Sequence, residues 1–143
     1  MSNKRDPIQR ITKARASLIL SQPFFGNIAL KLEPVEMEGL GTVGTDCFKL
    51  YYDPKFIDAL DDDELEFCIA HEVMHVAFSH PVRRGNRQHQ RWNAAGDYAI
   101  NPLLKDAGFK MPTMQGSDGK KQEFGLISDD YRDLSADAIY NRI

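Results

Sequence analysis

The stretch from Leu65 to Phe78 constrains this chain more than any other part of its sequence. Its apolar residues fall on every side of a helix, namely Leu65, Phe67, Cys68, Ile69, Ala70, Val73, Met74, Val76, Ala77 and Phe78. A helix that is apolar all round lies in a core. Two histidines and a glutamate interrupt it, in the run His71-Glu72-Val73-Met74-His75. Buried imidazoles and carboxylates are costly without polar partners, and a metal ion would partner all three.

The spacing of this H-E-x-x-H run suits metal chemistry. Residues four apart stack on one face of a helix, so His71 and His75 can each offer a nitrogen to one tetrahedral Zn²⁺. Glu72 is turned by about 100° from His71, beside the ligand pair, where it can take a proton from an attacking water. The alternative, two hydrogen-bonded core histidines and a surface glutamate, fits the apolar surroundings less well. We therefore predict a zinc site with Glu72 as general base.

A zinc hydrolase keeps three protein ligands and one open position, so a third ligand is needed. Asn93, Asp97 and Asn101 recur every four residues and form a polar stripe on an otherwise apolar helix. Such a stripe must face something polar inside the protein, and the motif helix supplies it. We expect Asp97 to be the third ligand, or else to fix the tautomer of a ligand histidine.

His80 is the alternative third ligand. It lies nine residues after His71, about 180° round an unbroken helix, and could coordinate only if the chain leaves the helix just before it. Pro81 favours such a break. Otherwise His80 is a helix-terminal histidine stabilised by the helix dipole. Cys68 shares the face of the two motif histidines, but it lies too far along the same helix to close a tetrahedral site, so packing is its expected role.

Composition narrows the classes of protein to which the chain can belong. A chain of 143 residues with 42% hydrophobic residues, 27% charged residues and a net charge of −3 is typical of one soluble globular domain. It lacks the basic bias of an obligate nucleic-acid binder. No apolar run approaches membrane-spanning length and the start has no signal segment, which favours a cytoplasmic location without membrane contact. Two cysteines, Cys47 and Cys68, are too few for a disulfide scaffold and are expected to be small buried residues.

Periodicity and turn residues predict an α+β fold for residues 1–143. The acidic run Asp61 to Glu64 is expected to cap the motif helix, and Ser135 the last helix. Strand 47–52 precedes the motif helix and could pair with an extended peptide by edge addition. The predicted helices are 7–21, 55–60, 63–80, 92–104 and 136–143; the predicted strands are 27–35 and 47–52; turns or loops are predicted at 39–44, 83–91 and 105–130.

Three blocks of the sequence, Leu50-Tyr51-Tyr52-Asp53-Pro54, AHEVMHVAFSHPVRR and WNAAGDYAIN, carry a family resemblance. Together they resemble the HExxH metallopeptidase domain of bacteria and phages that normally precedes a von Willebrand factor A-like domain. The resemblance implies a zincin-like fold, in which a small antiparallel or mixed sheet packs on the HExxH active-site helix and further helices. It implies peptidase activity, a following von Willebrand factor A-like domain that these residues do not include, and a ring-forming ATPase as a partner.

This chain departs from the pattern of the wider gluzincins in one respect. They carry a ligand glutamate on the helix after HExxH, four residues before an aspartate that supports a ligand histidine. This chain has Asn93 at the glutamate position and Asp97 at the other. Because a neutral amide is a poor zinc ligand, either Asp97 coordinates the metal or the site is weaker than a peptidase requires.

The predicted function is zinc-dependent hydrolysis of a peptide or protein substrate. An inactive scaffold stabilised by the metal is the alternative, because structural zinc contributes folding energy. Nucleic-acid association ranks last, because in a chain that is acidic overall a solvated loop explains the four arginines better; they are Arg83, Arg84, Arg87 and Arg91. Candidates for an oxyanion donor are Tyr98, Arg83 and Arg84, although packing or solvated roles suit each of them too.

Overall fold

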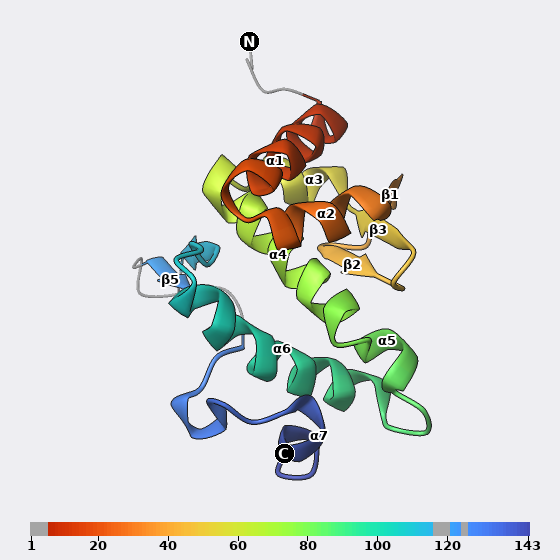
Figure 1. Cartoon of the computed structure of the whole chain (residues 1–143), viewed down its shortest axis with the longest axis vertical. Helices are drawn as coiled ribbons and strands as arrows, with labels where there is room; N and C mark the ends of the chain where they lie inside the picture. The colour runs from red at the N-terminus through yellow and green to blue at the C-terminus, as the bar shows by residue number, and fades with distance from the viewer. Residues whose placement is uncertain (1–5, 116–120, 124–125) are drawn as a thin grey trace.

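The structure is a computed structural model and describes residues 6–115, 121–123 and 126–143. Its first part is a helical pair, α1 (Pro7–Ser21) and α2 (Pro23–Lys31), that packs on the motif helix, with a small sheet beside them (Figure 1). The strands are β1 (Glu33–Glu36), β2 (Val43–Thr45) and β3 (Lys49–Tyr52). The short α3 (Pro54–Asp58) then leads to the long α4 (Asp62–Ala77). No helix in the described part of the chain is both long and apolar enough to cross a bilayer.

The sheet is mixed, with β3 in its centre. β1 pairs with β3 in parallel and β2 pairs with it antiparallel, which gives the order β1-β3-β2. The prediction of an α+β fold with a small mixed sheet is confirmed. Strand 47–52 was expected to offer a free edge, and that expectation is wrong because β3 has a neighbour on both sides. The edge strand next to the motif helix is β2, which contacts α4.

The strand predicted at 27–35 is wrong over residues 27–31, which belong to α2, and is confirmed only at its end, where β1 covers residues 33–35. Pro23 starts this helix instead of only ending the previous one, because proline fits the first helical turn. At Gly26 an added Cβ would lie 2.5 Å from the Cα of Ile19, so the backbones of α1 and α2 touch there. The apolar pattern of this segment fits either a helix or a strand. A contact between the two helices that only glycine permits therefore decides that the segment is helical.

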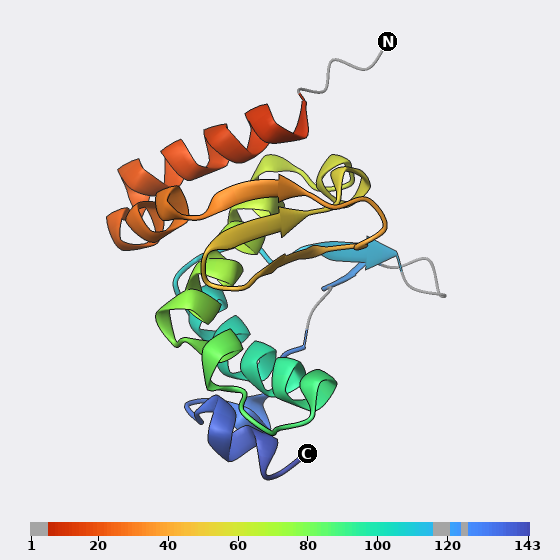
Figure 2. The same cartoon turned by 90° about the vertical axis from the view of Figure 1, so that its right-hand side faces the viewer.

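The main core contains the apolar side chains of α4, the helix that passes between the α1–α2 pair and the last part of the chain (Figures 1 and 2). Leu65, Ile69 and Val73 on this helix are at most 1% exposed. A capping box begins it: the Asp61 carboxylate accepts from the N–H of Glu64, and the Glu64 carboxylate accepts from the N–H of Asp61. The acidic run thus caps the motif helix as predicted. Packing and cap together hold the H-E-x-x-H segment in one orientation.

The second part of the chain is built on α6 (His89–Asp106), which crosses α4. The predicted helix 92–104 is confirmed and extends further at both ends, with Pro102 inside it. The predicted loop 83–91 is shorter than expected, because α5 (His80–Arg83) includes its first residue and α6 its last three. The region predicted as a loop at 105–130, part of which lies outside the described residues, contains the hairpin β4 (Thr113–Gln115) and β5 (Lys121–Glu123).

A smaller apolar cluster lies on the far side of α6, against α7 (Ala136–Tyr140). A short 3₁₀ helix, η1 (Asp129–Tyr131), precedes α7, and Ser135 caps α7 as predicted. The Arg87 guanidinium lies 4.7 Å from the Trp92 ring and 5.9 Å from the Tyr140 ring. It also forms an ion pair with Asp137 at 3.0 Å. Arginine, aromatic and acidic side chains therefore join α7 to the rest of the molecule.

Candidate metal centre

The end of α4 returns the chain toward its own motif. Ser79 adopts a left-handed backbone with φ 54°, which breaks the helix after Phe78. His80 then begins α5, and its carbonyl accepts a 2.7 Å hydrogen bond from the Trp92 indole N–H. The break expected before Pro81 is present. It turns the His80 ring back against His75, with the two ring centroids 5.2 Å apart.

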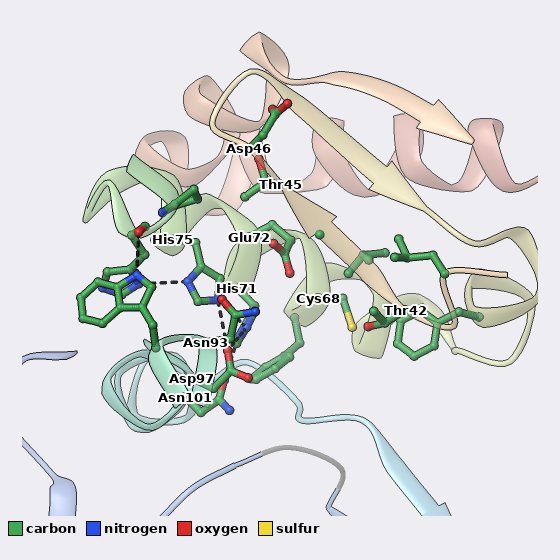
Figure 3. A pocket seen from close by; sticks show the side chains of 18 of the residues that line it. Thr42, Thr45, Asp46, Cys68, His71, Glu72, His75, Asn93, Asp97 and Asn101 are labelled. Atoms are coloured by element: carbon green, nitrogen blue, oxygen red, sulfur yellow. Dashed lines mark hydrogen bonds and ion pairs between the residues drawn. The ribbon is translucent and has the colours of Figure 1, made fainter. Parts of the chain in front are cut away.

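Three donor atoms converge where α4 crosses α6 (Figure 3). The Asp97 Oδ1 atom lies 2.9 Å from His71 Nε2 and 3.1 Å from His75 Nε2. The two Nε2 atoms are 3.0 Å apart. A tetrahedral Zn²⁺ with bonds of about 2.0–2.1 Å separates its ligand atoms by about 3.3 Å. The triangle is therefore close to the size that zinc requires, and its atoms are the imidazole and carboxylate donors that zinc accepts.

The protonation of His71 follows from its neighbour Asn101. The Asn101 amide donates from Nδ2 to the carbonyl of Leu126 at 2.8 Å, so its oxygen must be the atom that faces His71. Asn101 Oδ1 lies 2.8 Å from His71 Nδ1. An amide oxygen only accepts, so Nδ1 carries the proton. In the neutral ring the lone pair is then on Nε2 and points at the donor triangle.

His75 is oriented in a similar way by His80. The two Nδ1 atoms lie 2.9 Å apart. Burial, together with the charge of His75, lowers the pKa of His80 to about 4, so its ring is neutral at ordinary pH. We assign His75 Nδ1 as the donor and His80 Nδ1 as the acceptor, which leaves His75 Nε2 free for the triangle. The structure thus brings His80 behind His75, and the described group that could hold a metal consists of His71, His75 and Asp97.

Gly96 makes room for this arrangement. An added Cβ at residue 96 would lie 3.0 Å from His80 Nδ1 and 3.1 Å from His75 Cε1. The His80 ring cannot easily retreat, because it stacks on Phe78 on one side and meets the Trp92 ring on the other. The sequence offered only a weak sign of this role, a glycine inside a helical pattern directly before the candidate ligand Asp97.

The charges at the centre are strongly coupled. Burial opposes ionisation of Asp97, but hydrogen bonds to His71 and His75 hold the pKa of its carboxyl well below the usual range. Burial likewise opposes protonation of His71, but the hydrogen bond and charge of Asp97 outweigh it and raise the pKa of His71 to about 9. In the metal-free protein the anionic Asp97 carboxylate therefore holds a proton on His71, and a metal cation would have to displace that proton.

Glu72 lies beside the triangle and not within it. Its side chain is buried, and Figure 3 shows its carboxylate directed into the pocket near His71. Burial is the main cause that raises the pKa of Glu72 above its ordinary value. Cys68 lines the same pocket, and burial raises the pKa of its thiol, so the sulfur stays protonated. Cys47, expected to be buried, is only partly buried and has a left-handed backbone with φ 81°.

An open pocket of about 610 Å³ lies over these groups. One wall is β2 with the residues that flank it, from Thr42 to Asp46, and the floor is formed by α4 and α6. The polar stripe of α6 begins one turn before Asn93, because four residues at intervals of four line the pocket, namely His89, Asn93, Asp97 and Asn101. Of the candidate oxyanion donors, Arg84 lines the pocket; Tyr98 packs on Tyr131, and Arg83 pairs with Asp137.

Comparison with known proteins adds a family to this geometry. A search of curated proteins and a search of solved structures found no match to the chain. The family model described as "Putative metallopeptidase domain" matches residues 7–143, which include both helices that form the centre. A metallopeptidase uses a metal ion to hydrolyse peptide bonds, and the group of His71, His75 and Asp97 could hold such an ion. The chain therefore belongs to the family described as the "Putative metallopeptidase domain".

Proposed function

We propose that the protein is a zinc-dependent metallopeptidase of zincin-like architecture, in which His71, His75 and Asp97 hold the ion. One observation carries this proposal: three donor atoms from two helices lie 2.9–3.1 Å apart, with a buried carboxylate beside them and an open pocket above. Three protein ligands and an open side are the arrangement of catalytic zinc sites, whereas structural sites are closed by four. When bound, Zn²⁺ would polarise the scissile carbonyl and make water more acidic.

Glu72 is the proposed general base. A base works best when its pKa lies near the working pH, and burial raises the pKa of Glu72 in that direction. Its carboxylate takes a proton from the attacking water and delivers it to the leaving amine. His71 and His75 remain held by Asn101 and His80 during this transfer, so the base acts beside fixed ligands.

The edge of β2 is the proposed docking site for the substrate backbone. The carbonyl of Thr42 accepts from the N–H of Asp53 on the β3 side. Bonding alternates along an antiparallel ladder, so Gly44 bonds to β3 next, while Val43 and Thr45 turn their N–H and C=O groups away from it. An extended peptide could pair with these groups and lie along the pocket over the metal centre. This strand replaces β3 in the role expected from the sequence.

The test is Glu72→Gln, which keeps the volume of the side chain but removes the base. The purified protein should bind about one zinc per chain, and the variant should bind the same amount with unchanged thermal stability. Hydrolysis of a mixed fluorogenic peptide library should fall by roughly 10² or more. A wild-type chain that binds zinc and cleaves nothing would be the metal-stabilised scaffold, and hydrolysis at full rate in Glu72→Gln would exclude this base.

A further inference from the structure

The four arginines from Arg83 to Arg91 divide into two groups with different surroundings. Arg83 and Arg87 both pair with Asp137, and Arg91 donates to the carbonyl of Tyr140, so these three hold α7 in place. The fourth, Arg84, lines the pocket of the metal centre. Among the side chains that the structure describes, no carboxylate pairs with it; its hydrogen-bond partner is a ring nitrogen of His89.

Backbone geometry explains why Arg84 faces the pocket. Arg84 continues the right-handed helical conformation of α5, so it lies one turn after His80 and on the same face. His89 is the first residue of α6 and lies on the stripe that also carries Asn93 and Asp97. Two elements that already position the metal centre therefore also bring Arg84 and His89 together at one end of the pocket.

Arg84 and His89 can offer a ligand in the pocket only hydrogen-bond donors. A guanidinium has no acceptor, so the 3.0 Å contact between Arg84 Nη1 and His89 Nδ1 makes that nitrogen the acceptor and leaves the proton of the neutral ring on Nε2. Asp46, an acidic residue of the opposite wall, is already satisfied by the N–H groups of Phe48 and Lys49 and by the Tyr51 hydroxyl. A half-buried cation with free donors thus remains in a pocket that already has room for a ligand.

The geometry points to a carboxylate-binding subsite, formed by Arg84 and His89, that selects peptide substrates carrying a carboxylate near the scissile bond. Guanidinium groups match carboxylates in shape and charge. His89 lies eight residues before Asp97 on α6. That spacing corresponds to about 12 Å along the helix, which an extended peptide covers in about four residues. The carboxylate is then either the C-terminus of a short substrate or an acidic side chain within about four residues of the cleaved bond.

This inference rests on the proposed function, and a binding experiment separates the two. The probes are a hydroxamate joined to three alanines that end in a free carboxylate, and the same compound ending in a carboxamide. Zinc-loaded protein should bind the carboxylate about tenfold more tightly by calorimetry, as expected for one partly exposed charge-assisted contact. In Arg84→Gln that preference should disappear, while the affinity for the carboxamide stays the same.

Arg83→Gln is the matched control, because it removes the same charge from a neighbouring residue that pairs with Asp137. It should keep the tenfold preference, and circular dichroism should show all three proteins folded. A second pair of probes, ending in aspartate amide or asparagine amide, distinguishes a side-chain carboxylate from a C-terminal one. If the zinc-loaded protein binds both members of each pair equally, or Arg84→Gln keeps the preference, the subsite is wrong and the metal centre stands. If the zinc-loaded protein binds neither member of either pair, both the proposed metal centre and the subsite are wrong.

Discussion

The two helices that form the candidate metal centre contribute in different ways. α4 carries two of the three donor atoms and the proposed base within five consecutive residues, and its own cap and apolar packing hold them. α6 carries one donor, Asp97, and much of the support: Asn101 sets the tautomer of His71, and Gly96 admits the rings of His75 and His80. The compact H-E-x-x-H motif of α4 thus supplies most of the reactive groups. The polar stripe spread along α6 holds those groups in position.

The largest expected effect tests whether the two helices are equal as ligand donors. His75→Ala on α4 and Asp97→Ala on α6 should each lower zinc affinity by more than about 100-fold in a chelator competition, because changes to the outer partners of a site cost only about 10–100-fold. His80→Ala is the matched comparison for an outer partner and should stay within that smaller range. If Asp97→Ala costs no more zinc affinity than His80→Ala, α6 provides no ligand and only supports the site.

The next effect concerns how α6 sets the protonation of α4. In the metal-free protein Asp97 raises the pKa of His71 from its ordinary 6.5 to about 9. Since the folded pKa is the higher one, the resulting stability is fully present below pH 6.5 and is lost as the pH rises through 9. Chemical unfolding of metal-free protein should therefore show a free energy of unfolding lower at pH 9.5 than at pH 6.5, by at most about 3 kcal/mol.

Two further measurements sharpen this pH prediction. Zinc must displace the proton from His71, so binding between pH 6.5 and 9 should release it, which calorimetry in buffers of different ionisation enthalpy detects. Asp97→Asn removes the charge that raises the pKa and should flatten the stability profile over the same range. An unchanged profile in that variant would mean that Asp97 does not control His71.

The smallest expected effect tests whether zinc binding needs the space that α6 leaves at Gly96. Gly96→Ala should weaken zinc binding by about tenfold, because the added Cβ would press on His75 and His80, whose rings are packed in place. In the metal-free protein the same crowding opposes the gain of about 1 kcal/mol that alanine brings to a helix over glycine, so the free energy of unfolding should change by less than about 1 kcal/mol. Ala94→Gly on the same helix is the control: it should lose about 1 kcal/mol of stability and keep its zinc affinity. Equal zinc affinity in Gly96→Ala and the wild-type protein would show that the rings can move.

Local rules predicted the elements whose signals are complete within a few residues. The acidic cap at Asp61 and Glu64, the Ser135 cap and the apolar surface of α4 each depend on neighbours close in sequence, and each is present in the structure. The strand expected at 27–35 failed over residues 27–31 because its apolar pattern fits either a helix or a strand. Contact with α1 at Gly26 decided between them. Strand 47–52 was predicted, but its central position in the sheet was not, since pairing order depends on distant segments.

What the sequence alone determined about this protein is the content of its centre: two imidazoles four residues apart, a carboxylate beside them, and a polar stripe that contains Asp97. Helical spacing is a local property, so these features could be derived before any fold was known. Only the tertiary structure decided that Asp97 meets both histidines, that His80 lies behind His75 and that Arg84 faces the pocket. Those relations depend on the crossing of α4 and α6 and on the left-handed Ser79, which side-chain packing across the whole chain sets.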